Sequence, residues 1–206
     1  MAWISFVPFL MSGIRPRLTP CVPWLSQMNE TNLRTYVYDD LGRPGVWFYT
    51  LETDSTIAQK VARKLFHLNY NRASMKMIES QDKIDYSGTR WAGSCEYNKN
   101  FVKIKNSSQQ LSYHCNIKLG SQFQTAKSNS LEYFILERYR LFSCTGESLY
   151  SGKVWHQPYK FASVEANKIQ ENYSDFYLVP INRYNPNFIA KKVDVVIFPL
   201  KRVSKS

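Results

Sequence analysis

The sequence predicts an α+β domain built mainly from antiparallel β-strands, with two short helices. Aromatic residues make up 15% of the 206 residues, and large aromatic side chains favour β-sheets. Several segments alternate apolar and polar residues between clusters of Gly, Pro, Asn and Asp, a pattern typical of strands joined by turns. Neither an internal repeat nor a linker interrupts the chain, so we expect a single domain covering residues 1–206.

The first part of the chain is expected to contain three strands. Residues 1–11 are apolar enough for a signal peptide, but they lack a basic start, contain Pro8 and precede no small-residue cleavage site. We therefore interpret residues 3–11 as a buried strand in a cytoplasmic protein. After a proline-rich crossing segment, residues 32–38 and 46–51 form a predicted hairpin around a turn rich in Asp, Gly and Pro.

Two segments have helical periodicity. The first covers residues 57–66, where Asp54 or Ser55 can provide the N-cap. The second covers residues 131–138, where Asn129 and a glutamate three residues later resemble a capping box. In the first helix the basic residues oppose one apolar stripe. That stripe consists of Ile57, Ala58, Val61, Ala62, Leu65 and Phe66.

The remaining strands are predicted from alternation and from turn residues. Residues 72–119 are expected to form several antiparallel strands, with one of the turns near Gly88. Two more turns are expected at residues 81–82 and 106–108. Later strands are expected at residues 139–143, 148–156 and 163–170, followed by a late buried strand at 193–200.

The chain is basic, with a formal net charge of +11. No acidic residue lies between Glu96 and Glu132, a stretch that contains five lysines. A basic surface can attract nucleic acid or an anionic membrane. These lysines are spaced apart, so we interpret the region as a solvated basic face and do not expect nucleic acid to be a partner. No apolar run reaches membrane-spanning length, so we expect no membrane insertion.

Most motifs of known chemistry are absent from the sequence. There is no glycine-rich phosphate loop, no H-E-x-x-H and no G-x-S-x-G. The four cysteines form no C-x-x-C pair. His114 and Cys115 are adjacent, so on a strand they point to opposite faces and cannot share a metal ion. We expect neither a metal site nor a cofactor. A Cys–His catalytic pair is left open, although nothing favours it.

The main candidate site is a short polar segment, residues 67–72, directly after the first predicted helix. Its sequence, HLNYNR, combines an imidazole, a phenol, two amides and a guanidinium, but contains no lysine. The His67 imidazole is a common acid–base group, and Tyr70 can donate a hydrogen bond or act as a general acid. These two residues are the catalytic candidates. The alternative is that both only satisfy backbone groups where the helix ends.

Arginines supply candidate ligands for an anion, because the planar guanidinium matches a carboxylate or a phosphate. Arg34 lies in a predicted strand, on the same face as Asn32 and Tyr36. Each arginine taken alone can also pair with an acid or lie on the surface. The ligand-binding candidates are Arg15, Arg34, Asn71 and Arg72.

Several motifs in a fixed order resemble the YqjF-like family, bacterial proteins that carry a conserved domain of unknown function. The resemblance spans nearly the whole chain. The motifs are VPFLMSGIRPR (7–17), VPWLS (22–26), NLRTYV (32–37), GRPGVWFYTLETD (42–54), ARKLFHLNYNRASM (62–75), LERYRLF (136–142), GKVWHQPY (152–159) and DVVIFPL (194–200).

This family is similar to acetoacetate decarboxylase, which implies a mainly antiparallel, cone-shaped barrel around a small-molecule cavity. The decarboxylases form a Schiff base through a lysine in a glycine-aromatic-Pro-Lys-Lys stretch after a helix. Aligning that stretch with this helix end brings the two lysines onto Tyr70 and Asn71. A phenol cannot form an imine, and Lys64 and Lys76 are not natural substitutes. The resemblance therefore implies the cavity without the Schiff-base chemistry.

The start of the chain departs from the family pattern. Family members usually have several tens of residues before the strand that opens this chain. We therefore expect either a start codon assigned too late or a domain that is truncated at its N-terminus relative to the family.

The leading hypothesis is that the protein binds a small organic anion or metabolite in the barrel cavity, with turnover left open. A second hypothesis is a non-catalytic carrier or sensor of a hydrophobic or anionic metabolite. A third is binding of nucleic acid or an anionic surface through the basic residues 99–127. The sequence leaves the ligand and the oligomeric state open.

Overall fold

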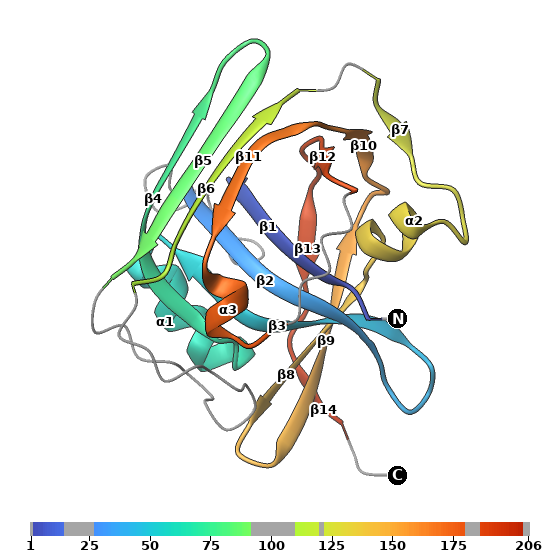
Figure 1. Cartoon of the computed structure of the whole chain (residues 1–206). Helices are drawn as coiled ribbons and strands as arrows, with labels where there is room; N and C mark the ends of the chain where they lie inside the picture. The colour runs from blue at the N-terminus through green and yellow to red at the C-terminus, as the bar shows by residue number, and fades with distance from the viewer. Residues whose placement is uncertain (1, 15–26, 92–109, 120–121, 180–185, 204–206) are drawn as a thin grey trace.

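The protein is mainly β, with three helices among the described residues (Figure 1). The computed structural model describes residues 2–14, 27–91, 110–119, 122–179 and 186–203. The prediction of mainly antiparallel strands accompanied by short helices is confirmed. The described residues contain one helix more than predicted, α3 (Tyr173–Phe176), which is a single turn. No helix in this part of the chain is long and apolar enough to cross a membrane.

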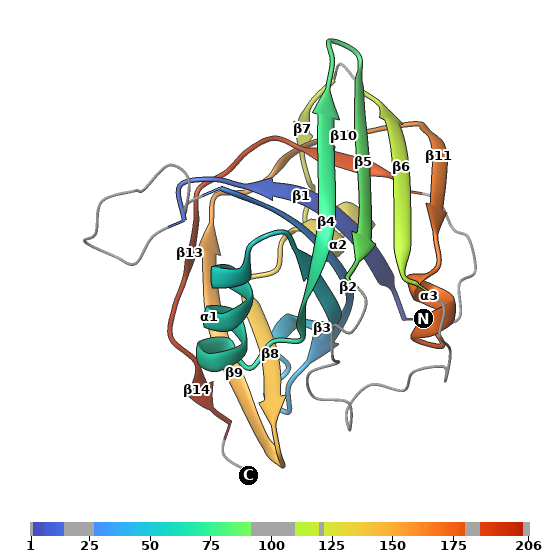
Figure 2. The ribbon, with the colours of Figure 1, turned by 90° about the vertical axis from the view of Figure 1, so that its left-hand side faces the viewer.

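Most strands belong to one large, strongly curved sheet (Figures 1 and 2). Its path runs β11-β6-β5-β4-β3-β8-β9-β13, and β2 joins it on β3, β1 on β2 and β14 on β9. A second sheet has the order β12-β10-β7. The strands are β1 (Ile4–Met11), β2 (Met28–Tyr38), β3 (Pro44–Thr53), β4 (Tyr70–Glu79), β5 (Lys83–Arg90), β6 (Ser112–Lys118), β7 (Gln124–Thr125), β8 (Arg140–Thr145), β9 (Ser148–His156), β10 (Lys160–Ser163), β11 (Ala166–Glu171), β12 (Phe188–Ala190), β13 (Val195–Ile197) and β14 (Lys201–Arg202).

The large sheet is an open path among the described residues, with β11 and β13 at its two ends. Its strand pairs are antiparallel except β3–β4 and β3–β8, so the prediction of a mainly antiparallel sheet is confirmed. The closure of that sheet into a cone-shaped barrel stays a prediction.

Strand β3 is the branch point of the sheet. One of its edges pairs with β2 along its whole length. The other edge pairs with β8 at Val46 and Trp47, and with β4 from Leu51 onward, in both cases in parallel. Where β8 and β4 diverge, the Asn69 side chain donates a hydrogen bond to the Tyr49 carbonyl oxygen at 2.8 Å. The segment that links α1 to β4 thus contacts β3 at the point between its pairings with β8 and β4.

Helix α1 (Thr56–Phe66) provides the crossover that a parallel β3–β4 pair requires (Figure 2). The Ser55 hydroxyl oxygen caps it by accepting the Ala58 N–H at 3.2 Å, so one of the two predicted caps is confirmed. The helix ends at His67, whose φ of 50° lies in the left-handed region and whose N–H donates to the Ala62 carbonyl.

The apolar stripe of α1 is only partly buried. Ala62 and Phe66 pack on the sheet, whereas Ile57, Val61 and Leu65 are 54%, 45% and 58% exposed. The reason is that two polar side chains of the same helix turn toward the sheet. The side chains of Gln59 and Arg63 both donate to the Tyr70 carbonyl oxygen.

Three local predictions were wrong. The second helix, α2 (Leu131–Leu136), is capped by Ser130, because Asn129 itself adopts a left-handed φ of 67°. Gly88 lies inside β5, where a Cβ atom would come within 2.4 Å of the Tyr113 ring, so its role is close packing and not a turn. The late strand β13 is exposed, because it pairs with β9 at the end of the sheet path.

Two apolar clusters pack on opposite faces of β2 and β3. One gathers around Leu33 and Tyr113 and includes residues of α3. The other gathers around Leu51 and Leu141, and α1 packs on it. Each face also contains buried polar side chains, and these define the candidate site.

Candidate functional site

Alternation along β2 sends its polar side chains to two faces. Glu30, Asn32 and Arg34 point to one face, and Thr31 and Leu33 point to the other. Each face of the β2–β3 pair contains one group of buried or half-buried polar residues. The Glu30 cluster is defined as Glu30, Asn32, Arg34, Tyr70 and Arg138. The Glu52 cluster is defined as Thr50, Glu52, Asn71, Arg90 and Tyr177.

At the centre of the Glu30 cluster, the Tyr70 hydroxyl donates a hydrogen bond to Glu30 Oε2 at 2.6 Å. Both side chains are buried. Burial raises the pKa of Glu30 to about 7, although hydrogen bonds from Tyr70 and Asn32 and the charge of Arg34 partly oppose this. Burial, and then the neighbouring Glu30 carboxyl, raise the pKa of Tyr70 well above its usual value. This pair can therefore hold a proton that is exchangeable near neutral pH.

The backbone at Tyr70 is held firmly by α1. Arg63 Nε donates to the Tyr70 carbonyl oxygen at 2.6 Å, and Arg63 Nη2 donates to Asn71 Oδ1 at 3.2 Å. The Tyr70 N–H donates to the Leu68 carbonyl oxygen at 2.9 Å. Because β4 pairs in register with β3 from Leu51↔Tyr70 onward, the Tyr70 side chain is directed at β2 and Glu30.

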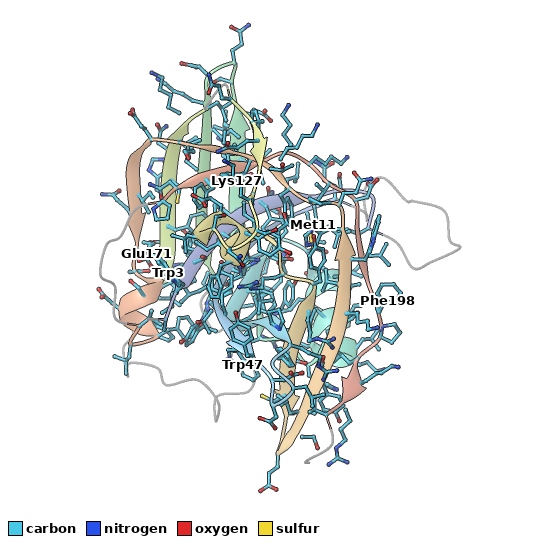
Figure 3. All side chains as sticks on the ribbon, turned by 90° about the vertical axis from the view of Figure 1, so that its right-hand side faces the viewer. Trp3, Met11, Trp47, Lys127, Glu171 and Phe198 are labelled. Atoms are coloured by element: carbon cyan, nitrogen blue, oxygen red, sulfur yellow. The ribbon has the colours of Figure 1, made fainter. Side chains whose placement is uncertain are left out.

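Two arginines lie at the other end of the Glu30 cluster, under α2. Arg34 Nη2 donates to the Ile135 carbonyl oxygen at 3.4 Å, and Arg138 Nη1 donates to the Glu137 carbonyl oxygen at 3.3 Å. The Cζ atoms of the two guanidinium groups lie 5.5 Å and 5.6 Å from the centre of the Tyr36 ring. Figure 3 views the molecule from the side on which α2 is labelled in Figure 1.

The Glu30 cluster is incompletely satisfied. Arg138 is only 8% exposed. Among the described residues, the buried atoms Asn32 Oδ1, Arg34 Nε, Arg138 Nε and Arg138 Nη2 have no hydrogen-bond partner. Neither guanidinium forms an ion pair with a carboxylate in this part of the chain. Burial lowers the pKa of Arg138, but a guanidinium stays protonated at neutral pH. Arg138 is therefore a buried cation without an ion-paired carboxylate among the described residues.

The Glu52 cluster, on the opposite face, is internally satisfied. Arg90 Nε and Nη2 donate to the two Glu52 carboxylate oxygens at 3.2 Å and 2.5 Å, a bidentate ion pair. Arg90 Nη2 also approaches Thr50 Oγ1 at 2.9 Å and the Tyr177 hydroxyl oxygen at 2.7 Å. Asn71 Nδ2 donates to Thr50 Oγ1 at 3.1 Å. This arrangement is what a structural polar core requires.

The six residues of the 67–72 segment are divided between different environments. Tyr70 joins Glu30, whereas the adjacent Asn71 joins the Glu52 cluster on the other face. The His67 ring lies 4.8 Å from the Tyr150 ring. The Arg72 guanidinium stacks over Trp91 at 4.7 Å and donates to the Thr53 carbonyl.

Of the other predicted ligand residues, Arg34 lies in the Glu30 cluster with Tyr70, and Arg15 lies outside the described residues. Of the five lysines of the basic region 99–127, Lys118 and Lys127 are described and the other three lie outside the described residues. Within the described residues, no group of three or more His, Cys, Asp or Glu side chains is arranged to hold a metal ion.

Two members of the Glu30 cluster were missed by sequence reasoning. Glu30 precedes Asn32 and Arg34 at the same two-residue spacing, so extending the predicted strand toward the N-terminus would have found it. Arg138 gave no such signal. The predicted second helix included it, whereas α2 ends at Leu136 and the chain turns Arg138 inward.

The fold is similar to that of acetoacetate decarboxylase. A crystal structure of acetoacetate decarboxylase from Legionella pneumophila matches with a TM-score of 0.60, over 98% of this chain and 84% of that chain. The sequence identity in this match is 11%, so the likeness concerns the fold alone.

The chain belongs to the DUF2071 family, whose description is "Uncharacterized conserved protein (COG2071)". The family model matches residues 1–193. The uncharacterized protein YqjF of Bacillus subtilis (strain 168) is 32% identical over 204 residues, which cover 98% of this chain and 78% of YqjF. The resemblance to the YqjF-like family predicted from the sequence is confirmed.

Proposed function

We propose that this protein binds a small organic anion on the Glu30 face of β2 and β3, within a cavity of a cone-shaped barrel. The observation that carries the proposal is the charge balance of the Glu30 cluster. The half-buried Arg34 and the buried Arg138 share this face with one carboxyl group whose pKa is about 7, so the cluster has a net positive charge when Glu30 is protonated. An anionic ligand would compensate that charge and supply acceptors to the guanidinium groups.

The proposed site does not use an imine. The resemblance to the decarboxylases aligns Tyr70 with one of their lysines, and the Tyr70 hydroxyl donates a hydrogen bond to Glu30 at 2.6 Å. Lys64 and Lys76 are exposed. Borohydride reduction with acetoacetate is therefore expected to leave the mass of the protein unchanged. A covalent adduct on any lysine would overturn this part of the proposal.

The Tyr70–Glu30 pair supplies a proton donor beside the proposed anion. A neutral Glu30 carboxyl can share a proton with the Tyr70 hydroxyl, which in turn can donate to a ligand oxygen. This chemistry serves either binding or general acid catalysis. The alternative of a carrier or sensor uses the same site without turnover. Mass spectrometry of gently purified protein separates the two, because retention of an unaltered ligand supports carriage and conversion supports an enzyme.

A thermal-shift screen with a panel of organic anions tests the site. We expect at least one anion to raise the melting temperature of the wild type, and to do so less for Tyr70→Phe and Arg34→Ala. Tyr86→Phe, a half-buried tyrosine on β5, is the matched control and should respond like the wild type. Equal shifts in all four proteins would show that the anion binds elsewhere.

A further inference from the structure

The Arg138 guanidinium has one edge in use and one edge without a protein partner. Nη1 donates to the Glu137 carbonyl oxygen at 3.3 Å. Nε and Nη2 are buried and have no hydrogen-bond partner among the described residues. These two atoms point to the same side of the guanidinium group. Together they form the edge that binds a carboxylate through two parallel hydrogen bonds.

On the opposite face of the sheet, Arg90 binds a carboxylate through the same edge of its guanidinium group. Arg90 binds Glu52 through its own Nε and Nη2, at 3.2 Å and 2.5 Å from the two carboxylate oxygens. Arg90 is buried to almost the same degree as Arg138, with 7% of its surface exposed against 8%. The Arg90–Glu52 pair is therefore an internal example of what the Arg138 edge can bind, and no carboxylate of the described chain reaches Arg138.

Aromatic rings fix the orientation of that edge. The Arg138 guanidinium lies 4.2 Å from the centre of the Phe134 ring and 5.6 Å from that of Tyr36, and these two rings are 5.2 Å apart. A guanidinium stacked on an aromatic face keeps its N–H groups in its own plane, free for in-plane acceptors. The rings also make the surroundings apolar, which strengthens a buried charge-assisted hydrogen bond.

From this geometry we propose that Arg138 binds the carboxylate group of the ligand through Nε and Nη2, so that the ligand is a small monocarboxylate. The inference rests on the proposed function and specifies its ligand class. A planar carboxylate has two acceptor oxygens for the two donors of this edge and one negative charge for one guanidinium. A phosphate dianion carries a third terminal oxygen and a second negative charge. Arg34 is less available to compensate that second charge, because the Glu30 carboxyl lies nearby.

The second arginine orients the rest of the ligand. Arg34 lies on the same face of β2 as Glu30, and its guanidinium and that of Arg138 approach the same Tyr36 ring at 5.5 Å and 5.6 Å. A ligand with its carboxylate on Arg138 would direct its other end toward Arg34 and Glu30. An oxygen at that end would meet the Arg34 Nε donor, which is buried without a partner in the described protein.

Calorimetric titration with matched probes tests the assignment. The probes are propionate and benzoate, their uncharged amides propionamide and benzamide, and inorganic phosphate. The proteins are wild type, Arg138→Lys, which keeps the charge but loses the planar fork, and Arg138→Gln. Arg140→Lys is the control, because Arg140 is a half-buried arginine two residues away that donates to Ser151. Circular dichroism checks that each variant is folded.

We expect the wild type to bind at least one carboxylate at least tenfold more tightly than its amide and more tightly than phosphate. Arg138→Lys and Arg138→Gln should each weaken that binding at least tenfold, and Arg140→Lys should change it less than twofold. Carboxylate binding that survives both Arg138 variants overturns the assignment to Arg138 but leaves the proposed function intact. Preference for phosphate overturns the ligand class. Absence of binding by any anion to the wild type contradicts the proposed function itself.

Discussion

The Glu30 cluster and the Glu52 cluster lie on opposite faces of the same two strands, and each contains a buried carboxyl and buried arginine. In the Glu52 cluster the arginine binds the carboxylate through two atoms, and Thr50, Asn71 and Tyr177 complete the network. In the Glu30 cluster the carboxyl is bound by a tyrosine instead, and the arginines keep buried donors without protein partners.

The difference separates a structural role from a binding role. Unpaired buried polar atoms cost free energy, so native proteins satisfy nearly all of them within the chain or by other molecules. The Glu52 cluster needs nothing more from outside, and we assign it to stability. The Glu30 cluster leaves donors that a ligand oxygen would satisfy, and this is why the proposed function is located there.

The largest expected effect comes from breaking the satisfied cluster. Arg90→Met would leave the Glu52 carboxylate buried without its cation, which should lower the free energy of unfolding by about 3–5 kcal/mol. Urea denaturation at pH 7 followed by tryptophan fluorescence measures this change. A loss below about 1 kcal/mol would contradict the structural role of the Glu52 cluster.

The next largest effect is the pH dependence caused by Glu30. Its pKa of about 7 in the folded protein is above the ordinary value of 4.5, so the folded state binds more protons than the unfolded state between these values. This contribution to stability is complete below pH 4.5 and is lost as the pH rises to 7. The loss amounts to at most about 3 kcal/mol.

Glu30→Gln should remove that loss, because glutamine cannot ionise and still accepts the Tyr70 hydrogen bond. The free energy of unfolding of wild type and variant, measured from pH 5 to pH 8, should therefore diverge in favour of the variant as the pH rises. Parallel curves would mean that Glu30 is ionised in the folded protein throughout this range.

A smaller effect is expected from the Tyr70 hydroxyl. Tyr70→Phe removes one buried hydrogen bond and leaves the Glu30 carboxyl with fewer donors, which should cost about 1–2 kcal/mol. Tyr86→Phe on β5 serves again as control in the same denaturation experiment. If both variants lose the same stability, the Tyr70–Glu30 bond is no more than an ordinary contact.

The smallest effect should come from Arg138. Arg138→Met removes a buried cation that has no carboxylate partner among the described residues. The free energy of unfolding should change by less than about 1 kcal/mol in either direction. The contrast with Arg90→Met, measured in the same buffer, is the informative quantity. A loss for Arg138→Met as large as that for Arg90→Met would mean that Arg138 also belongs to the structural core.

Sequence reasoning predicted the elements better than their contacts. Strand β9 was predicted at its observed bounds, 148–156, and the Ser55 cap and the end of α1 were also predicted, because alternation, caps and helical periodicity are local signals. The exposure of Leu65 was not predicted, because the helix turns Arg63 toward the Tyr70 carbonyl, a contact that depends on the β3–β4 pairing.

The candidate site was predicted only in part, because its contacts also depend on how distant segments pack. Tyr70 and Arg34 lie in one cluster, but Asn71 points to the opposite face, because successive residues of a strand alternate. Arg138 joins Arg34 only through the packing of α2 on β2, and this long-range contact leaves no pattern in the sequence.

The most direct test compares the two arginine edges in one sample by NMR of the arginine Nε–H groups. Variants Arg138→Lys and Arg90→Lys assign the two signals, and the wild type is then titrated with the carboxylate that binds in calorimetry. We expect the Arg138 Nε–H signal to shift and to saturate with the calorimetric affinity, while the Arg90 Nε–H signal stays unchanged. An unchanged Arg138 signal at saturation, or an equal shift of the Arg90 signal, would contradict it.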